Sequence, residues 1–169
     1  KTLVIMLLSL LSPALNDLDR HLENRETYIV EKYSRIKDLQ QELENADDAD
    51  PKGLYDLSYG LFEEYQSFKY DSAYFYAGCA LEQALKSGDK DKIVQSRCAL
   101  VFCYLSSGLF LEAFDEMKGI DARGVSNEVK AEYFALYNRL CYDASDFNNT
   151  EGWSYEYTRQ GTLYADSLM

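Results

Sequence analysis

Apolar residues recur every seven positions over the first quarter of the chain. The series runs through Leu15, Leu22, Ile29, Ile36 and Leu43. With charged residues on most other faces, this spacing predicts an amphipathic helix with a narrow apolar stripe. A strict heptad is typical of a coiled coil, but Arg25 and Lys32 occupy positions of its second seam. Two arrangements stay open: packing along the next helices of the same chain, or pairing with a second copy in a homodimer.

A second periodicity follows the acidic linker that ends this helix at Pro51. Two later segments each show an apolar helix pattern, a short turn and an aromatic residue three positions before an alanine. These pairs are Tyr70–Ala73 and Phe110–Ala113. The alanine lets two helices approach closely, and the aromatic ring fills the gap at the turn. The interval between the pairs is 40 residues, and we expect a loop over residues 87–91.

This pattern resembles the tetratricopeptide repeat, a helix–turn–helix unit of about 34 residues. The resemblance implies an all-α fold with a long N-terminal helix followed by a tetratricopeptide-like helix–turn–helix solenoid. We expect the helix and its linker over 15–50, and repeats over 51–169, at about 53–90, 91–127 and 128–169. No polar capping helix follows the last repeat, so we expect the array to continue beyond Met169.

The first fourteen residues predict a signal peptide. Lys1 precedes an apolar run of nine residues, which is shorter than the roughly 20 residues of a membrane span. A small-x-small cleavage site ends at Ala14. A buried N-terminal helix or strand is the alternative. Export predicts a periplasmic protein in an oxidising compartment.

The cysteines lack the C-x-x-C spacing of a zinc or redox site. They are Cys79, Cys98, Cys103 and Cys141. Each lies in an apolar helical stretch, so we expect buried free thiols. One disulfide, from Cys79 to Cys98 or Cys103, is the alternative.

Composition narrows the function further. The 169 residues include 17 basic and 29 acidic side chains, a net charge of −12, and 47% are hydrophobic. The hydrophobic fraction excludes a disordered chain, and the acidic excess argues against nucleic-acid binding by this part. His21 is the only histidine, and the acidic linker lacks the glycine and terminal Glu of an EF-hand loop. We therefore expect no enzyme, no cofactor and no metal site.

Two segments point to a family. They are Leu22-Glu23-Asn24-Arg25-Glu26-Thr27-Tyr28-Ile29 and Leu61-Phe62-Glu63-Glu64-Tyr65-Gln66-Ser67-Phe68. Together with the repeats, they resemble the N-terminal region of a Bacteroidetes family of membrane-spanning transcriptional regulators, of the starch-utilisation-regulator type. Members of this family carry a signal, a long charged helix, periplasmic tetratricopeptide-like repeats, a membrane helix and a cytoplasmic DNA-binding end.

The resemblance implies a periplasmic sensor or interaction module of a regulator of polysaccharide utilisation, which binds an oligosaccharide or a protein partner in a concave helical groove. A missing segment would anchor the parent protein in the inner membrane, and a missing C-terminal part would bind DNA. The alternative is an exported tetratricopeptide-repeat adaptor or scaffold that binds a protein partner only. A third reading, an outer-membrane glycan-binding lipoprotein, is disfavoured because no cysteine follows the cleavage site.

The first helix of each repeat would line the concave face. The repeat register proposes these ligand- or partner-binding residues: Tyr55, Phe62, Tyr65, Gln95, Phe102, Asn138 and Tyr142, with Cys98 beside them. An aromatic ring at helical spacing is more often part of a core, so packing is the alternative for each. We assign to packing outright Tyr59, Tyr70, Tyr74, Tyr104, Phe110 and Phe114.

Overall fold

The structure is a computed structural model that describes residues 19, 21–148 and 150–166. The signal peptide predicted at 1–14 lies outside these residues. The chain divides into two compact units, Lys1–Asp38 and Leu39–Met169. Within the described residues the structure has helices α2 to α8 and no strand, as the predicted all-α fold requires.

The long N-terminal helix is α2, Arg25–Asn45. It contains Ile29, Ile36 and Leu43 of the predicted heptad and stops before the acidic linker, whereas Leu22 precedes α2 and Leu15 lies outside the described residues. Asp50 then precedes α3, and Pro51 occupies its first helical position. Proline suits that position because its missing N–H would have no partner there and its fixed φ is already helical. The linker therefore joins the end of α2 to the start of α3.

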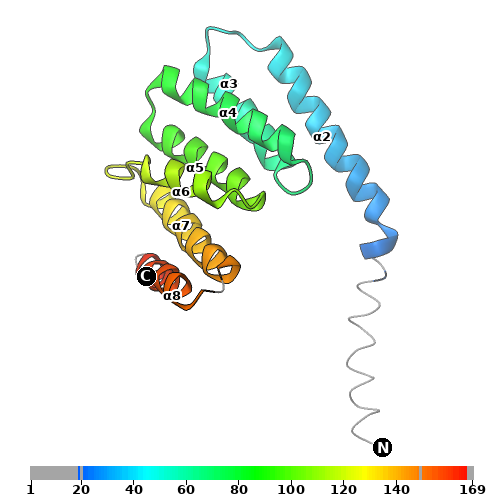
Figure 1. The fold of residues 1–169 in the computed structure, drawn as a ribbon. Coiled ribbons are helices and arrows are strands. Elements are labelled where there is room, and N and C mark those ends of the chain that lie inside the picture. The colour runs from blue at the N-terminus through cyan, green and yellow to red at the C-terminus, as the bar shows by residue number, and fades with distance from the viewer. Residues whose placement is uncertain (1–18, 20, 149, 167–169) are drawn as a thin grey trace, which may run out of the picture. The chain divides into compact units, whose positions relative to one another are not determined.

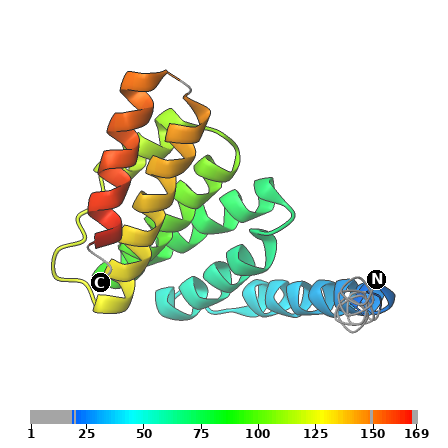
Figure 2. The same cartoon turned by 90° about the horizontal axis from the view of Figure 1, so that it is seen from below.

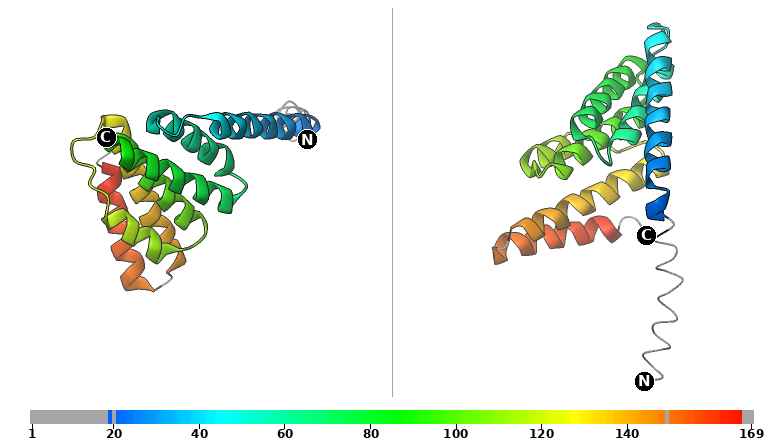
Figure 3. Two further views of the ribbon diagram at one scale, coloured as in Figure 1. Left: turned by 90° about the horizontal axis from the view of Figure 1, so that it is seen from above. Right: turned by 90° about the vertical axis from the view of Figure 1, so that its right-hand side faces the viewer.

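Three antiparallel helix pairs follow, and each is one repeat. The pairs are α3 (Pro51–Tyr65) with α4 (Tyr70–Ser87), α5 (Lys90–Ser106) with α6 (Phe110–Lys118), and α7 (Asn127–Phe147) with α8 (Glu151–Asp166) (Figure 1). The pairs lie side by side in chain order, because α5 contacts both α4 and α7 (Figure 2). The right-hand view of Figure 3 shows α7 and α8 along their shared length. This arrangement is the helix–turn–helix solenoid.

Small residues allow the helices of the solenoid to pack closely. Ala73 and Ala113, the two alanines of the repeat signature, are 1% and 0% exposed. The turn between α5 and α6 uses Gly108 at φ +73°, a conformation that a side chain would strain. The signature residues therefore have the packing roles that the sequence predicted.

The predicted loop at residues 87–91 is shorter in the structure. Gly88 ends α4 in the left-handed region, and the Asp89 carboxylate accepts a hydrogen bond from the backbone N–H of Lys92. This cap starts α5 at Lys90, so Lys90 and Asp91 are helical rather than part of the loop. A good capping residue directly after the glycine explains the difference.

The largest described core cluster joins the second and third repeats. Val101 on α5, Met117 on α6 and Leu140 on α7 are fully buried within it. All four cysteines are free thiols: Cys98, Cys103 and Cys141 are buried, and Cys79 is half-buried. In the part of the chain that the structure describes, none of the helices combines the length and the apolar character needed to cross a membrane.

Candidate binding groove

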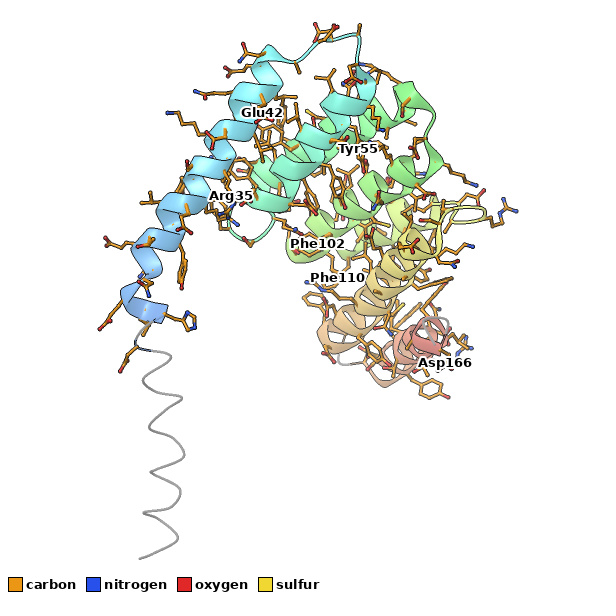
Figure 4. The ribbon with its side chains drawn as sticks, turned by 180° about the vertical axis from the view of Figure 1, so that it is seen from behind. Arg35, Glu42, Tyr55, Phe102, Phe110 and Asp166 are labelled. Carbon is orange, nitrogen blue, oxygen red and sulfur yellow. The ribbon has the colours of Figure 1, made fainter. Side chains whose placement is uncertain are left out.

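The first helices of the three repeats line a groove of about 310 Å³. Figure 4 labels Phe102 on α5, which lines the groove, and Tyr55 on α3, which stacks on the lining residue Tyr59. The residues that line it are Tyr59, Phe62, Gln66, Cys98, Ala99, Phe102, Glu132, Ala135, Leu136 and Arg139. We call this surface the α3–α5–α7 groove. Because its lining comes from all three repeats, no single repeat could form this groove.

Equivalent residues of successive helices meet across the groove. An offset of 40 residues relates Phe62 to Phe102, and an offset of 37 relates Phe102 to Arg139. The same offsets relate Tyr55 to Gln95 and Gln95 to Glu132. The groove is therefore built in tiers, each of which takes one residue from every repeat.

The tier at the N-terminal ends of these helices is polar. The Tyr55 hydroxyl donates to Gln95 Oε1 at 3.5 Å, and Gln95 Nε2 donates to Glu132 Oε2 at 3.4 Å. Lys92 Nζ lies 2.6 Å from Asp56 Oδ1 and 4.1 Å from the centre of the Tyr55 ring. Burial raises the pKa of the Tyr55 phenol well above its ordinary value, so the hydroxyl remains a donor.

The floor of the groove is aromatic and apolar. The Tyr59 ring stacks on Tyr55 with 5.6 Å between centroids and lies 5.5 Å from the ring of Phe62. Cys98 and Ala99 of α5 are small and leave room above the helix. Burial, followed by the nearby Glu132 carboxylate, raises the pKa of the Cys98 thiol to about 12. Because the thiol stays protonated, Cys98 acts as an apolar surface and not as a nucleophile.

In the tier at the other end of the groove, the positive charge of Arg139 is paired with the carboxylate of Asp143. The Arg139 guanidinium lies 5.2 Å from the centre of the Phe102 ring, and its Nε is 3.3 Å from Asp143 Oδ2. A guanidinium on an aromatic face is an attractive contact. This end therefore presents a half-buried ring covered by an ion pair.

The structure brings some of the predicted binding residues together in the groove. Phe62, Phe102 and Cys98 line it, whereas Tyr55 and Gln95 do not line it but are linked by hydrogen bonds to Glu132, which does. Tyr65 instead stacks on Tyr76 at 5.7 Å, and its hydroxyl accepts a hydrogen bond from Gln40. These observations give the positions of the side chains. The binding role of each residue stays a prediction.

The predicted residues of the third repeat contact α8. Asn138 Nδ2 donates to the Gly161 carbonyl at 2.9 Å. The Tyr142 hydroxyl lies 3.3 Å from Thr162 Oγ1. Both side chains are therefore engaged between α7 and α8 and do not line the α3–α5–α7 groove.

Sequence reasoning missed seven residues of the groove. They are Tyr59, which was assigned to packing, Gln66 and Ala99 of the first two repeats, and Glu132, Ala135, Leu136 and Arg139 of α7. Tyr59 does pack against its neighbours, but it also faces the groove. A 37-residue offset from Gln95, Cys98 and Phe102 points to Glu132, Ala135 and Arg139. This offset could have identified these three groove residues from the sequence alone.

A larger hollow of about 650 Å³ lies beside the loop at residues 119–126. Its lining comes from that loop and the start of α7, so it does not combine the three repeats. Arg123 Nε donates to Asp121 at 2.7 Å, and Lys90 lies 3.6 Å from the same carboxylate. Among the described residues there is also no cluster of His, Cys, Asp and Glu that could hold a metal ion. The groove remains the strongest candidate.

One comparison with known proteins identifies a family. The model of a protein family described as the SusR N-terminal TPR domain, where TPR stands for tetratricopeptide repeat, matches residues 22–169. The match includes α2, all three repeats and every residue of the groove. No curated protein and no solved structure matches the chain. A helical domain of the tetratricopeptide type is a non-catalytic fold that generally mediates protein interactions.

Proposed function

Because the chain belongs to the family of SusR N-terminal TPR domains, we propose that it is the sensor or interaction module of a membrane-spanning regulator of polysaccharide utilisation. In this proposal the module lies in the periplasm and binds its partner in the α3–α5–α7 groove. Occupation of the groove changes the curvature of the repeats, and this change is the signal. The exported adaptor, which binds a protein partner without regulating transcription, is the alternative.

One observation carries the choice of the groove. Equivalent positions of three successive repeats converge on one surface, and that surface holds the aromatic residues Tyr59, Phe62 and Phe102. Binding energy is usually concentrated in a few aromatic and apolar residues at the centre of an interface. Since every repeat contributes, an occupant would contact all three and report on their relative orientation.

The burial of the rings favours a protein segment over an oligosaccharide. Phe62 is 4% exposed and Tyr55 is 4% exposed, so other side chains already cover the faces on which a sugar would stack. Apolar side chains of a partner need only the edges and gaps between such rings. An oligosaccharide remains the second candidate because Tyr59 and Phe102 are half-buried, and Gln66 and Glu132 could bind its hydroxyl groups.

The test fills the groove in the native gene. Ala135 is exposed on the wall of the groove, so Ala135→Trp occupies the space without disturbing the core. Glu112→Trp on the exposed side of α6 is the matched control. Transcription of polysaccharide-utilisation genes is then measured with and without the polysaccharide. We expect induction to be lost with Ala135→Trp and kept with Glu112→Trp.

Two outcomes contradict the proposal. Normal induction by a stable Ala135→Trp protein would exclude the groove as the sensing site. Unchanged transcription after deletion of the whole gene would exclude a regulator and leave the exported adaptor.

A further inference from the structure

The N-terminal half of the long helix presents apolar side chains to solvent. Leu22 is 59% exposed and Ile29 is 41% exposed, and both belong to the heptad series. Residues 21–23 are helical, as α2 is, so the series continues N-terminally from Ile29 to Leu22. We call the face that carries Leu22, Arg25, Ile29 and Lys32 the α2 seam. It lies entirely within the first compact unit, Lys1–Asp38.

The α2 seam contains a hollow of about 390 Å³. The residues that line this hollow are His21, Leu22, Arg25, Tyr28, Ile29 and Lys32. With Leu22 and Ile29 at position a of the heptad, the six residues occupy positions g, a and d of two successive heptads. The four residues from Arg25 to Lys32 have the spacing i, i+3, i+4 and i+7. Four residues at this spacing form one of the holes into which a side chain of the facing helix inserts in a coiled coil.

The composition of this hole predicts the direction of the facing helix. If the facing helix is a parallel copy, position a stands beside position a, and the hole receives the apolar side chain of Ile29. If the copy is antiparallel, position a stands beside position d, and the hole receives Arg25 or Lys32. That cation would lie between the two cations that already line the hole, which is unfavourable at close range. The hole therefore favours a parallel copy.

The cations of the α2 seam have compensating neighbours in a parallel pair. The hole that receives a residue at position d includes the residue at position e that follows it on the other helix. Arg25 would therefore lie beside Glu26 of the second copy, and Lys32 would lie beside Tyr33 of the second copy. A carboxylate and an aromatic face both attract a cation, so these contacts offset the repulsion between like charges in the seam.

The edges of the α2 seam are complementary as well. In a parallel pair, position g contacts position e of the next heptad on the other helix, which pairs His21 with Glu26. The same relation pairs the exposed rings of Tyr28 and Tyr33. In the structure the Tyr28 hydroxyl lies 3.5 Å from His21 Nδ1, so the two residues at position g stand together on one edge.

The other charged side chains between residues 21 and 38 do not oppose this pairing. Arg35 is the next residue at position g, and it would face the neutral Gln40. The rest occupy positions b and c, on the far side of the helix from the seam: Glu23, Glu31, Lys37 and Asp38.

From this hole geometry and charge complementarity we propose that the α2 seam binds the α2 seam of a second copy of this chain, as a short parallel coiled coil. Leu22 and Ile29 of both copies form its apolar core. Charged residues within a seam lower the stability of a coiled coil while they specify how its helices pair, so the dimer is weak and reversible. This inference goes beyond the proposed function and does not depend on the α3–α5–α7 groove.

The first test measures the association of the whole 169-residue chain by analytical ultracentrifugation, from micromolar to millimolar concentration. We expect a reversible equilibrium between monomer and dimer. Ile29→Glu should raise the dissociation constant by about tenfold or more, because it places two carboxylates side by side in an apolar core. Val30→Glu is the matched control, since Val30 is 68% exposed at position b, outside the seam, and it should leave the dissociation constant unchanged.

A second test determines the direction of the pair by mild oxidation of Leu22→Cys in a Cys79→Ser background. In a parallel pair the two Leu22 positions face each other, within the distance of about 7 Å between Cα atoms that a disulfide requires. In an antiparallel pair in which Leu22 faces Lys32, they would lie roughly 15 Å apart along the helices. We expect a cross-linked dimer for Leu22→Cys and none for Thr27→Cys, which stands at the outer position f.

Each contrary result overturns the inference. A chain that stays monomeric over the whole range, or a dimer that Val30→Glu weakens as much as Ile29→Glu does, would refute the α2 seam as the interface. A dimer that depends on Ile29 but is not cross-linked through Leu22→Cys would refute the parallel arrangement. The proposed function is decided separately, by the induction experiment with Ala135→Trp on α7.

Discussion

The ring of Phe62 on α3 meets the ring of Phe102 on α5 edge to face, with 6.3 Å between centroids and 85° between ring planes. The two rings are equivalent positions of successive repeats, yet their surroundings differ. Phe62 is 4% exposed, whereas Phe102 is half-buried and lines the open side of the groove. One ring therefore serves mainly the core, whereas the other keeps part of its surface at the groove, beside the Arg139 guanidinium.

The two phenylalanines should separate stability from binding. Phe62→Ala should lower the free energy of unfolding by about 3–5 kcal/mol, because it leaves a cavity in the core. Phe102→Ala should cost less than half as much and weaken binding in the groove more. Urea denaturation measures the first effect, and the induction experiment described for Ala135→Trp measures the second. Equal costs for both variants would contradict this division of roles.

Arg97 should stabilise the short helix α6. Arg97 Nε lies 2.6 Å from Glu116 Oε1, and its Nη1 donates to the Gly119 carbonyl. Both charged side chains are largely shielded from water. Arg97→Ala should therefore lower the free energy of unfolding by about 1–2 kcal/mol. Arg97→Lys should recover less than half of this loss, since an ammonium group does not reproduce the fixed fork of the guanidinium; full recovery would show that charge alone matters.

Cys79 should be the first cysteine to react with a thiol reagent. Burial raises the pKa of the Cys103 and Cys141 thiols to about 11, and Cys98 reaches about 12. Cys79 is half-buried, and its pKa is raised less. We expect iodoacetamide to label Cys79 in the folded protein and the other three only after unfolding, as read by peptide mass spectrometry. Rapid labelling of Cys98 in the folded state would contradict the burial described.

Glu63→Gln should make the free protein more stable. Burial, then the Glu132 and Glu64 carboxylates, raise the pKa of Glu63 above its ordinary value of 4.5. A raised pKa means that ionisation of Glu63 costs stability as the pH rises through that pKa. The gain from Gln should therefore be present at neutral pH and fade near pH 4, where the wild-type carboxyl is protonated. Because Glu63 is largely exposed, we expect an increase of only about 1 °C in Tm.

A lower Tm for Glu63→Gln at neutral pH would show that the Glu63 carboxylate has a stabilising partner.

Gly161 should tolerate no large side chain. A Cβ atom at this position would lie 3.2 Å from Cys141 Cβ and 3.2 Å from Tyr142 Cε2, which brings α8 close to α7. Gly161→Leu should lower the free energy of unfolding by about 1–3 kcal/mol through overpacking. Gly152, also on α8, has no atom within 4 Å of such a Cβ. Gly152→Ala should be neutral or slightly stabilising, and equal losses at both sites would point to the helix backbone instead of packing.

The helices could be predicted because their signals are local. Ala73 and Ala113 mark the close approach of paired helices, and Pro51 marks a helix start, whatever the rest of the fold does. The start of α5 was missed because Asp89 was interpreted as a loop residue, although it follows a glycine and caps the next helix. The hydrogen bond from the Lys92 N–H to the Asp89 carboxylate sets the start of α5.

The groove could be predicted only where the repeat length stays constant. The 40-residue interval led correctly from α3 to α5 and placed Phe102 opposite Phe62. The interval then shortens to 37 residues, since α6 has only nine residues, and the third repeat was placed out of register. Asn138 also donates to the backbone carbonyl of Gly161 on α8, its predicted partner helix, which turns the Asn138 side chain away from the groove.

The hydrogen bonds from Tyr55 through Gln95 to Glu132 connect three repeats at one end of the groove. The other end is held by ring contacts, namely Phe62 against Phe102 and Arg139 against Phe102. Such contacts let two helices shift past each other more easily than directional hydrogen bonds do. A wedge between α3 and α7 would therefore spread the second end first, with the hydrogen-bonded side chains as the hinge axis. We therefore expect a directional stiffness, in which the repeats open about the hydrogen-bonded edge more easily than they stretch along it.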